Sequence, residues 1–168
     1  MAERTPSRLS DLPRRKSPRL PGFTYHETHA YSVTICTRDR TPHFAAESVG
    51  REVAHCLEEQ AAQCGYTLVC YCIMPDHVHI LTAPSMTEGA IPLPQFIRQF
   101  KSAATHRLGK LGIAKEIWQR SFYDHVLRKD EDLERVASYI LANPVRKGLA
   151  QAPEAYPLSG YFPENCRT

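Results

Sequence analysis

Two neighbouring apolar segments joined by a three-residue turn constrain the fold of this chain more than any other feature. Residues 66–73 (YTLVCYCI) are almost continuously apolar, which predicts a strand that is central or buried on both faces of a sheet. Met74-Pro75-Asp76 forms a turn, and residues 77–82 (HVHILT) are rich in β-branched and apolar side chains. The sequence therefore predicts two consecutive strands in the middle of the domain.

The segments around these two strands predict the fold class. Further strands are indicated by the alternation of residues 31–36 and by residues 122–127, and apolar spacings of three and four predict three helices. Ser48 is placed to cap the first helix and Asn143-Pro144 to stop the last. The predicted helices span 48–65, 94–109 and 130–142. The order βαββαβ plus one helix indicates an α+β, ferredoxin-like sandwich with an antiparallel sheet and an added C-terminal helix.

The chain divides into one folded domain and two tails. Residues 1–22 form a predicted disordered basic arm, with six Lys/Arg against two acidic residues. The remaining chain has 15 basic and 16 acidic residues, so an anionic partner has to be met by local patches. We expect the catalytic domain to span 23–151 and an irregular proline-rich tail to span 152–168.

The sequence shows no segment typical of a membrane or secreted protein. No apolar run approaches the roughly 20 residues of a membrane span, and the N-terminal residues lack the apolar core of a secretory signal. Six irregularly spaced cysteines in such a chain indicate reduced thiols. We therefore expect a cytoplasmic protein.

The His77-Val78-His79 triplet is the first candidate site. Side chains alternate along a strand, so both imidazoles point the same way, roughly 7 Å apart along the chain, while Val78 and Ile80 enter the core opposite. Two such imidazoles can share one divalent metal ion. Spacing alone leaves open a pair of merely exposed or hydrogen-bonded histidines.

A structural zinc site is a weaker alternative for the same histidines. Cys70 and Cys72 share a strand face and precede the histidine pair. One residue separates the two thiols, however, where zinc sites usually have two to four.

The last predicted helix carries a second candidate group. Its core-facing arc consists of Leu133, Val136, Ala137, Ile140 and Leu141. Tyr139 falls at the margin of that arc and Asn143 lies one turn further on. The simple interpretation is a packed tyrosine with its hydroxyl in water. If the helix crosses the histidine face, Tyr139 and Asn143 instead reach the metal, a set suited to phosphodiester chemistry with Mg²⁺ or Mn²⁺.

Basic residues and aromatic residues alternate in the second half of the chain, as in proteins that bind unpaired nucleic acid. Residues 98–129 contain eight Lys/Arg and two acidic residues. The alternative is a solvated helix face with aromatic side chains in the core, which we favour for Phe122. The candidate DNA-binding residues are Arg98, Lys101, Arg107, Trp118, Arg120 and Arg128, together with Arg15 and Lys16 of the arm.

Three motifs, in this order, resemble those of the REP-associated tyrosine transposases, which belong to the HUH single-stranded-DNA transposase superfamily. They are YxxMPDHVH at 71–79, WQRSFYDH at 118–125 and YIxxNPVxxGL at 139–149. The similarity extends from about residue 15 to residue 161 and includes YSVTICT at 31–37.

The resemblance implies roles for individual residues and a substrate. His77 and His79 match the metal-binding histidines, Asn143 matches a polar metal ligand, and Tyr139 matches the nucleophile that forms a 5′-phosphotyrosine link and frees a 3′-hydroxyl. The implied substrates are single-stranded DNA hairpins of repetitive extragenic palindromes (REP) with a flanking guide sequence. A nucleoid-associated protein, either a monomer or a homodimer, is the corresponding expectation.

Two other functions fit the same residues. One is a catalytically silent protein that binds DNA hairpins, and the other is a nickase similar to HUH replication initiators. Within the transposase hypothesis, Tyr123 is the second candidate nucleophile.

Overall fold

The computed structural model describes residues 29–86, 89–113, 116–127 and 132–167. The basic arm predicted for residues 1–22 lies outside the described residues. The strands are β1 (Tyr31–Cys36), β2 (Tyr66–Met74), β3 (His77–Pro84), β4 (Tyr123–Val126) and β5 (Ser159–Tyr161). The α-helices are α1 (Glu47–Gln63), α2 (Leu93–Lys110), α3 (Leu133–Leu141) and α4 (Asn143–Arg146).

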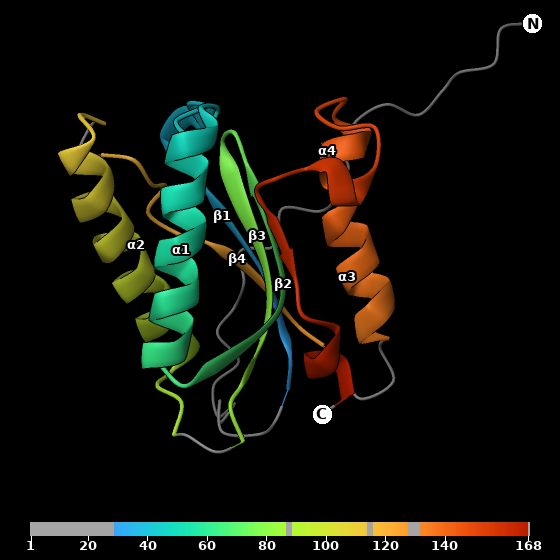
Figure 1. Ribbon diagram of the computed structural model, residues 1–168. Helices are drawn as coiled ribbons and strands as arrows, with labels where there is room; N and C mark the ends of the chain where they lie inside the picture. Colours follow the sequence, from blue (N-terminus) through green and yellow to red (C-terminus); the bar gives the residue numbers. More distant parts are fainter. Residues whose placement is uncertain (1–28, 87–88, 114–115, 128–131, 168) are drawn as a thin grey trace, which may run out of the picture.

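The strands form one antiparallel sheet in the order β4-β1-β3-β2-β5. The first six elements follow the chain order βαββαβ, so the predicted ferredoxin-like α+β class is confirmed. Helices α1 and α2 cover one face of the sheet, and α3 and α4 lie on the other (Figure 1). The sheet is therefore the middle layer of three.

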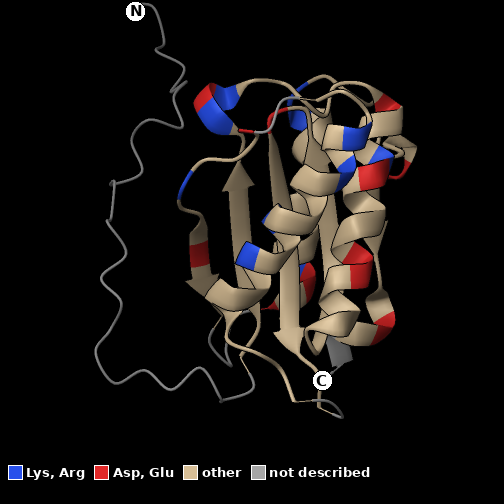
Figure 2. Cartoon of the chain, turned by 90° about the vertical axis from the view of Figure 1, so that its left-hand side faces the viewer, with Lys and Arg blue, Asp and Glu red and all other residues tan. Residues whose placement is uncertain are grey.

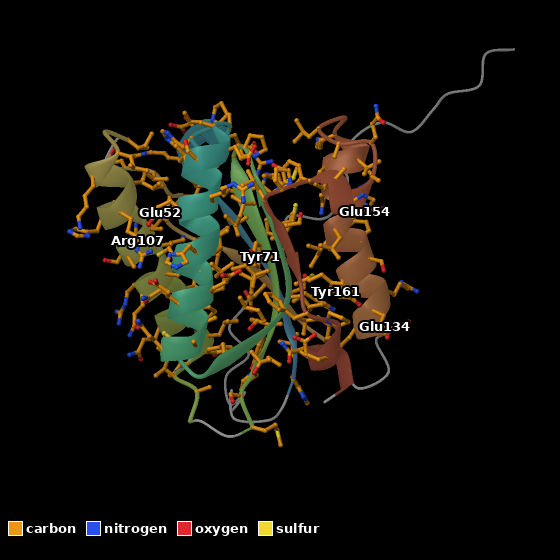
Figure 3. The ribbon with its side chains drawn as sticks, viewed as in Figure 1. Glu52, Tyr71, Arg107, Glu134, Glu154 and Tyr161 are labelled. Carbon is orange, nitrogen blue, oxygen red and sulfur yellow. The ribbon has the colours of Figure 1, made fainter. Side chains whose placement is uncertain are left out.

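The larger core lies between the sheet and the helices α1 and α2. Val78 and Ile80 of β3 are fully buried there, as the alternation of β3 predicted. Phe96 and Phe100 are buried on the inner face of α2. Tyr71 of β2 reaches into this layer, where its hydroxyl donates to Glu58 Oε1 of α1 at 2.7 Å (Figure 3).

The smaller core lies between the sheet and α3. Cys70 and Cys72 of β2 and Leu81 of β3 are buried in it. Of the predicted helix arc, Ala137 and Ile140 are buried there too, and the other three residues are partly buried and pack against it. Asp132 begins α3, because its carboxylate accepts hydrogen bonds from the N–H groups of Glu134 and Arg135. The face that carries the histidines is thus covered by the added helix.

A β-bulge in β2 decides which residues face which core. The register with β3 shifts between Leu68 and Cys70. Leu68, Tyr71 and Ile73 then pack in the larger core, while Val69 and Cys70 both face the smaller one. Because a bulge adds one unpaired residue, the alternation reverses beyond it.

Three local expectations need correction. Residues 152–168 were expected to be irregular, but β5 pairs with β2 and continues the sheet at that edge. Ser48 does not cap α1, which has Ala46 at its N-cap without a side-chain bond. Asn143-Pro144 does not end the helical path but begins α4, because proline is tolerated in a first helical turn. The limits of the catalytic domain, 23 and 151, stay a prediction.

Candidate active site

The two histidines of β3 converge on one point. The Nε2 atoms of His77 and His79 lie 3.0 Å apart, and the two rings meet edge to face with centroids 4.7 Å apart. Both side chains leave the same face of the strand, as the sequence predicted. The two Nε2 atoms are therefore much closer together than the roughly 7 Å that separates alternate residues along a strand, because the side-chain torsions bring the two rings toward each other.

Each imidazole is held through its other nitrogen. Nδ1 of His77 donates to Asp76 Oδ1 at 2.5 Å, because a carboxylate can only accept. Nδ1 of His79 lies 2.9 Å from Oγ1 of Thr34, the residue paired with His79 across β1 and β3. Asp76 is itself paired with Arg40, whose Nε lies 2.9 Å from Asp76 Oδ2. At 3.0 Å without an ion, one Nε2–H donates to the other Nε2. When both protons stand on Nδ1, as the contacts with Asp76 and Thr34 allow, each Nε2 has a lone pair that can bind an ion.

Burial keeps both imidazoles neutral. It is the main cause that lowers the pKa of His79 to about 3, with the charges of His77, Arg146 and Arg40 acting in the same direction. Burial also lowers the pKa of His77, against the raising effect of Asp76. Neutral imidazoles are the form that binds metal ions.

The histidine pair fits a divalent cation. Two cis ligands about 2.1 Å from one octahedral ion lie about 3 Å apart, which matches the Nε2 separation. A carboxylate or hydroxyl on the second nitrogen, as supplied by Asp76 and Thr34, is the usual support of a metal-binding histidine.

A structural zinc site is not assembled in the part of the chain that the structure describes. There, no three side chains of His, Cys, Asp or Glu are grouped to hold an ion. Cys72 pairs with His79 across the strands, but its thiol is fully buried, and burial raises its pKa to about 11. Without a metal ion, the Cys72 thiol is therefore a protonated, apolar member of the smaller core.

Tyr139 lies on α3, the helix that crosses the histidine face of the sheet (Figure 1). Its side chain is 59% exposed, in agreement with its predicted place at the margin of the buried arc. Asn143, half-buried at the start of α4, donates through Nδ2 to Ile140 O at 2.8 Å and accepts through Oδ1 from Arg146 at 2.8 Å. The metal-binding role of Asn143 stays a prediction.

Tyr123, the second candidate nucleophile, lies on the edge strand β4 and is 63% exposed. It pairs across the strands with Thr34 of β1. Both candidate tyrosines are therefore accessible to solvent, and exposure does not separate them.

Two of the predicted DNA-binding cations make contacts within the protein. Lys101 Nζ donates to the carbonyls of Gln119 at 2.8 Å and Ser121 at 3.0 Å. Arg107 of α2 pairs with both Glu52 and Glu59 of α1; Figure 3 labels Arg107 and Glu52 on these neighbouring helices. Both cations therefore already have partners within the protein.

Trp118 is packed against the larger core. Its ring lies 5.2 Å from the centroid of Phe44 and 5.6 Å from that of Phe100, and its indole N–H donates to Lys101 O at 3.1 Å. Phe122 also packs against this core, as favoured from the sequence. The tryptophan is half-buried, so only part of its surface is open to a ligand.

Arg98 and Arg120 are exposed, whereas Arg15, Lys16 and Arg128 lie outside the described residues. Arg120 and Lys110 line a groove of about 980 Å³ between α2, the turn at Arg38–Arg40 and residues 116–120. Figure 2, which looks onto the α2 side, has most of its Lys and Arg in the upper half of the view. Arg38, which lines the groove, follows Thr37, whose N–H donates to Asp76 O at 2.9 Å.

Sequence analysis missed four residues that the structure brings to this site: Thr34, Arg40, Asp76 and Arg146. Asp76 and Thr34 had a signal, since one precedes His77 and the other lies on the neighbouring strand. Arg40 had none, because it reaches Asp76 from a turn in which Asp39 and Arg40 both have positive φ, 52° and 56°. Arg146 lies two helical turns after Tyr139.

Comparison with known proteins defines the class of this chain. Residues 25–143 match the family model described as "Transposase IS200 like". The matched segment is more than half of the chain, so the protein belongs to the IS200-like transposase family and is an enzyme of the transposase class. The resemblance to REP-associated tyrosine transposases is thereby confirmed.

Two named relatives support this classification. A Haemophilus influenzae protein named "Putative REP-associated tyrosine transposase" is 29% identical over 145 residues, which cover 78% of each chain. The Escherichia coli REP-associated tyrosine transposase is 28% identical over 95 residues, covering 56% of this chain and 54% of that protein.

A solved structure of a REP-associated tyrosine transposase bound to a REP hairpin has the same fold. It superimposes with a TM-score of 0.69 at 22% identity, covering 86% of this chain and 84% of that one. Within the described residues, no helix is long and apolar enough to cross a membrane.

Proposed function

We propose that this transposase is a metal-dependent, single-stranded DNA endonuclease and strand transferase that acts on REP-like hairpins with a flanking guide sequence. The observation that carries the proposal is the pair of Nε2 atoms 3.0 Å apart on the sheet face that α3 covers. The match to the IS200-like family supports the reaction class, and the hairpin bound to the structural relative supports the substrate.

Tyr139 is the proposed nucleophile. Its Oη attacks the phosphorus of the scissile phosphodiester, and the bond from phosphorus to the 3′ oxygen breaks. The phenolic proton passes to solvent, the leaving oxygen takes up a proton, and a 3′-hydroxyl and a 5′-phosphotyrosine result. The new bond is again a phosphodiester, so attack by a 3′-hydroxyl rejoins DNA without ATP.

His77 and His79, with Asn143 as the further ligand, would hold Mg²⁺ or Mn²⁺ and leave coordination positions open for the phosphate. Such an ion, when bound, offsets charge on the phosphate oxygens and orients the phosphate. Asp76 and Thr34 keep both imidazoles turned toward the ion. Of the four predicted DNA-binding cations that the structure describes, Arg98 and Arg120 are exposed and are proposed to contact the DNA backbone, whereas Lys101 and Arg107 already have partners in the protein.

The test is covalent trapping on single-stranded hairpins taken from around the protein's own gene, with Mg²⁺ or Mn²⁺. The wild-type protein should give an adduct on a denaturing gel, and Tyr139→Phe should abolish it while hairpin binding survives. Tyr123→Phe is the matched control, because it removes the hydroxyl of a similarly exposed tyrosine. Adducts that persist in Tyr139→Phe and vanish in Tyr123→Phe would reassign the nucleophile.

Other outcomes of the same assay distinguish the two alternative functions and show whether one or two subunits form the active site. Hairpin binding by the wild type without any adduct would indicate a silent binding protein, and adducts on origin sequences but not on hairpins would indicate an initiator-like nickase. Mixing Tyr139→Phe with His77→Ala restores adducts only if two subunits share a site. Action on such hairpins also places the protein at the nucleoid.

A further inference from the structure

Arg146, at the end of α4, contacts the proposed nucleophile in two ways. Its guanidinium carbon lies 4.1 Å from the centroid of the Tyr139 ring. One guanidinium nitrogen also donates to the Tyr139 carbonyl at 3.1 Å and to Asn143 Oδ1 at 2.8 Å. A single cation therefore contacts the ring of Tyr139, its backbone and the neighbouring amide.

The junction of α3 and α4 explains why this arrangement forms. In a continuous helix the carbonyl of Ile140 would accept from the N–H of residue 144, but Pro144 has none. The side chain of Asn143 supplies the missing donor to Ile140 O at 2.8 Å. Helical hydrogen bonding resumes when Arg146 N donates to Ala142 O at 3.1 Å. Arg146 then lies two turns after Tyr139, on the same face.

The stacked tyrosine is 59% exposed, so neighbouring core residues do not immobilise its ring. A planar guanidinium that is itself fixed by two hydrogen bonds supplies that constraint.

We propose that Arg146 is a positioning residue for Tyr139, whose guanidinium covers one face of the ring and sets the direction in which the hydroxyl leaves α3. This inference rests on the proposed function of Tyr139. In-line attack requires a narrow range of approach, and a small misplacement of a reacting group slows a reaction up to a hundredfold.

The experiment compares Arg146→Met and Arg146→Lys with the wild type at saturating hairpin and Mn²⁺. Rates of adduct formation and of its reversal by an added 3′-hydroxyl strand are measured in single turnovers. We expect both rates to fall about tenfold or more in both variants, and by the same factor, because positioning acts on the transition state that cleavage and rejoining share. The fraction of adduct at equilibrium should therefore stay unchanged.

Lysine keeps the charge but loses the flat guanidinium, so it separates positioning from charge. A wild-type rate in Arg146→Lys would overturn the inference, as would a fall in only one of the two rates. Arg135→Gln is the matched control, since it removes an exposed arginine from α3 and should leave both rates unchanged. Thermal unfolding of each variant identifies loss of folded protein.

This inference and the proposed function fail in different ways. Adducts in Tyr139→Phe would remove the nucleophile itself. Loss of adducts in Tyr139→Phe together with wild-type rates in Arg146→Met would remove only the role of Arg146.

Discussion

The two faces of the sheet are built differently. Against α1 and α2, large side chains such as Phe96, Phe100 and Ile80 are fully buried. Against α3, the smaller core is made of cysteines, a methionine, leucines and the single strongly buried large residue of α3, Ile140. The face toward α1 and α2 holds the larger set of buried apolar residues, and the face toward α3 combines a smaller core with the paired imidazoles.

The difference shows how one sheet serves two purposes. On the α3 face, the two imidazoles are tolerated because each has a hydrogen-bond partner: His77 has Asp76 and His79 has Thr34. Substitutions on the first face should therefore change stability, and substitutions on the second should change chemistry.

The largest expected effect tests this division in the larger core. Phe100→Ala should lower the free energy of unfolding by about 3–5 kcal/mol, because it leaves a cavity among fully buried residues. Urea denaturation measures the loss, and Phe100→Leu should recover most of it. The adduct rate per folded molecule should stay at the wild-type value.

Ile140→Ala is the counterpart on the other face. It should cost about 2–4 kcal/mol and also slow adduct formation per folded molecule, because α3 carries Tyr139. An unchanged rate in Ile140→Ala, or a reduced rate in Phe100→Ala, would contradict the division between the two faces.

An intermediate effect is expected at Asp76. Asp76→Ala should weaken Mn²⁺ binding by about 10- to 100-fold, since the carboxylate orients His77. Isothermal titration without DNA measures the affinity. Asp76→Asn keeps an acceptor for Nδ1 of His77 but loses the ion pair with Arg40. Its affinity for Mn²⁺ should therefore lie between those of the wild type and Asp76→Ala. Wild-type affinity in Asp76→Ala would remove the carboxylate from the site.

The smallest effect separates two arginines that the sequence treated alike. Arg107→Gln should lower stability by about 1 kcal/mol or less, because its ion pairs to α1 are roughly one-third exposed, and it should leave hairpin affinity unchanged. Arg120→Gln should weaken hairpin binding and reduce the salt dependence by about one counterion, with no change in stability. Affinity measured across a salt series distinguishes the two, and the reverse pattern would assign DNA contact to Arg107.

Much of the fold was predictable because it depends on local rules. The alternation of β3 correctly separated Val78 and Ile80 from the two histidines, and the helical spacing correctly found the buried arc of α3. The strand β5 was missed because its three residues are too few to show a period. The cap of α1 was misplaced because Ser48 suited the position by residue type alone.

The sequence by itself determined the βαββαβ order, the shared face of His77 and His79, and the added helix that carries Tyr139. These follow from the periods of strands and helices, which each segment contains within itself. Only the tertiary structure decided the meeting of the two Nε2 atoms, the bulge that turns Cys72 toward the smaller core, and the approach of Arg40 to Asp76. The Nε2 contact depends on side-chain torsions set by distant partners, and the bulge depends on strand pairing. The approach of Arg40 depends on a left-handed turn. Arg146 belongs with these, because its contacts with Tyr139 exist only once α4 has continued from α3.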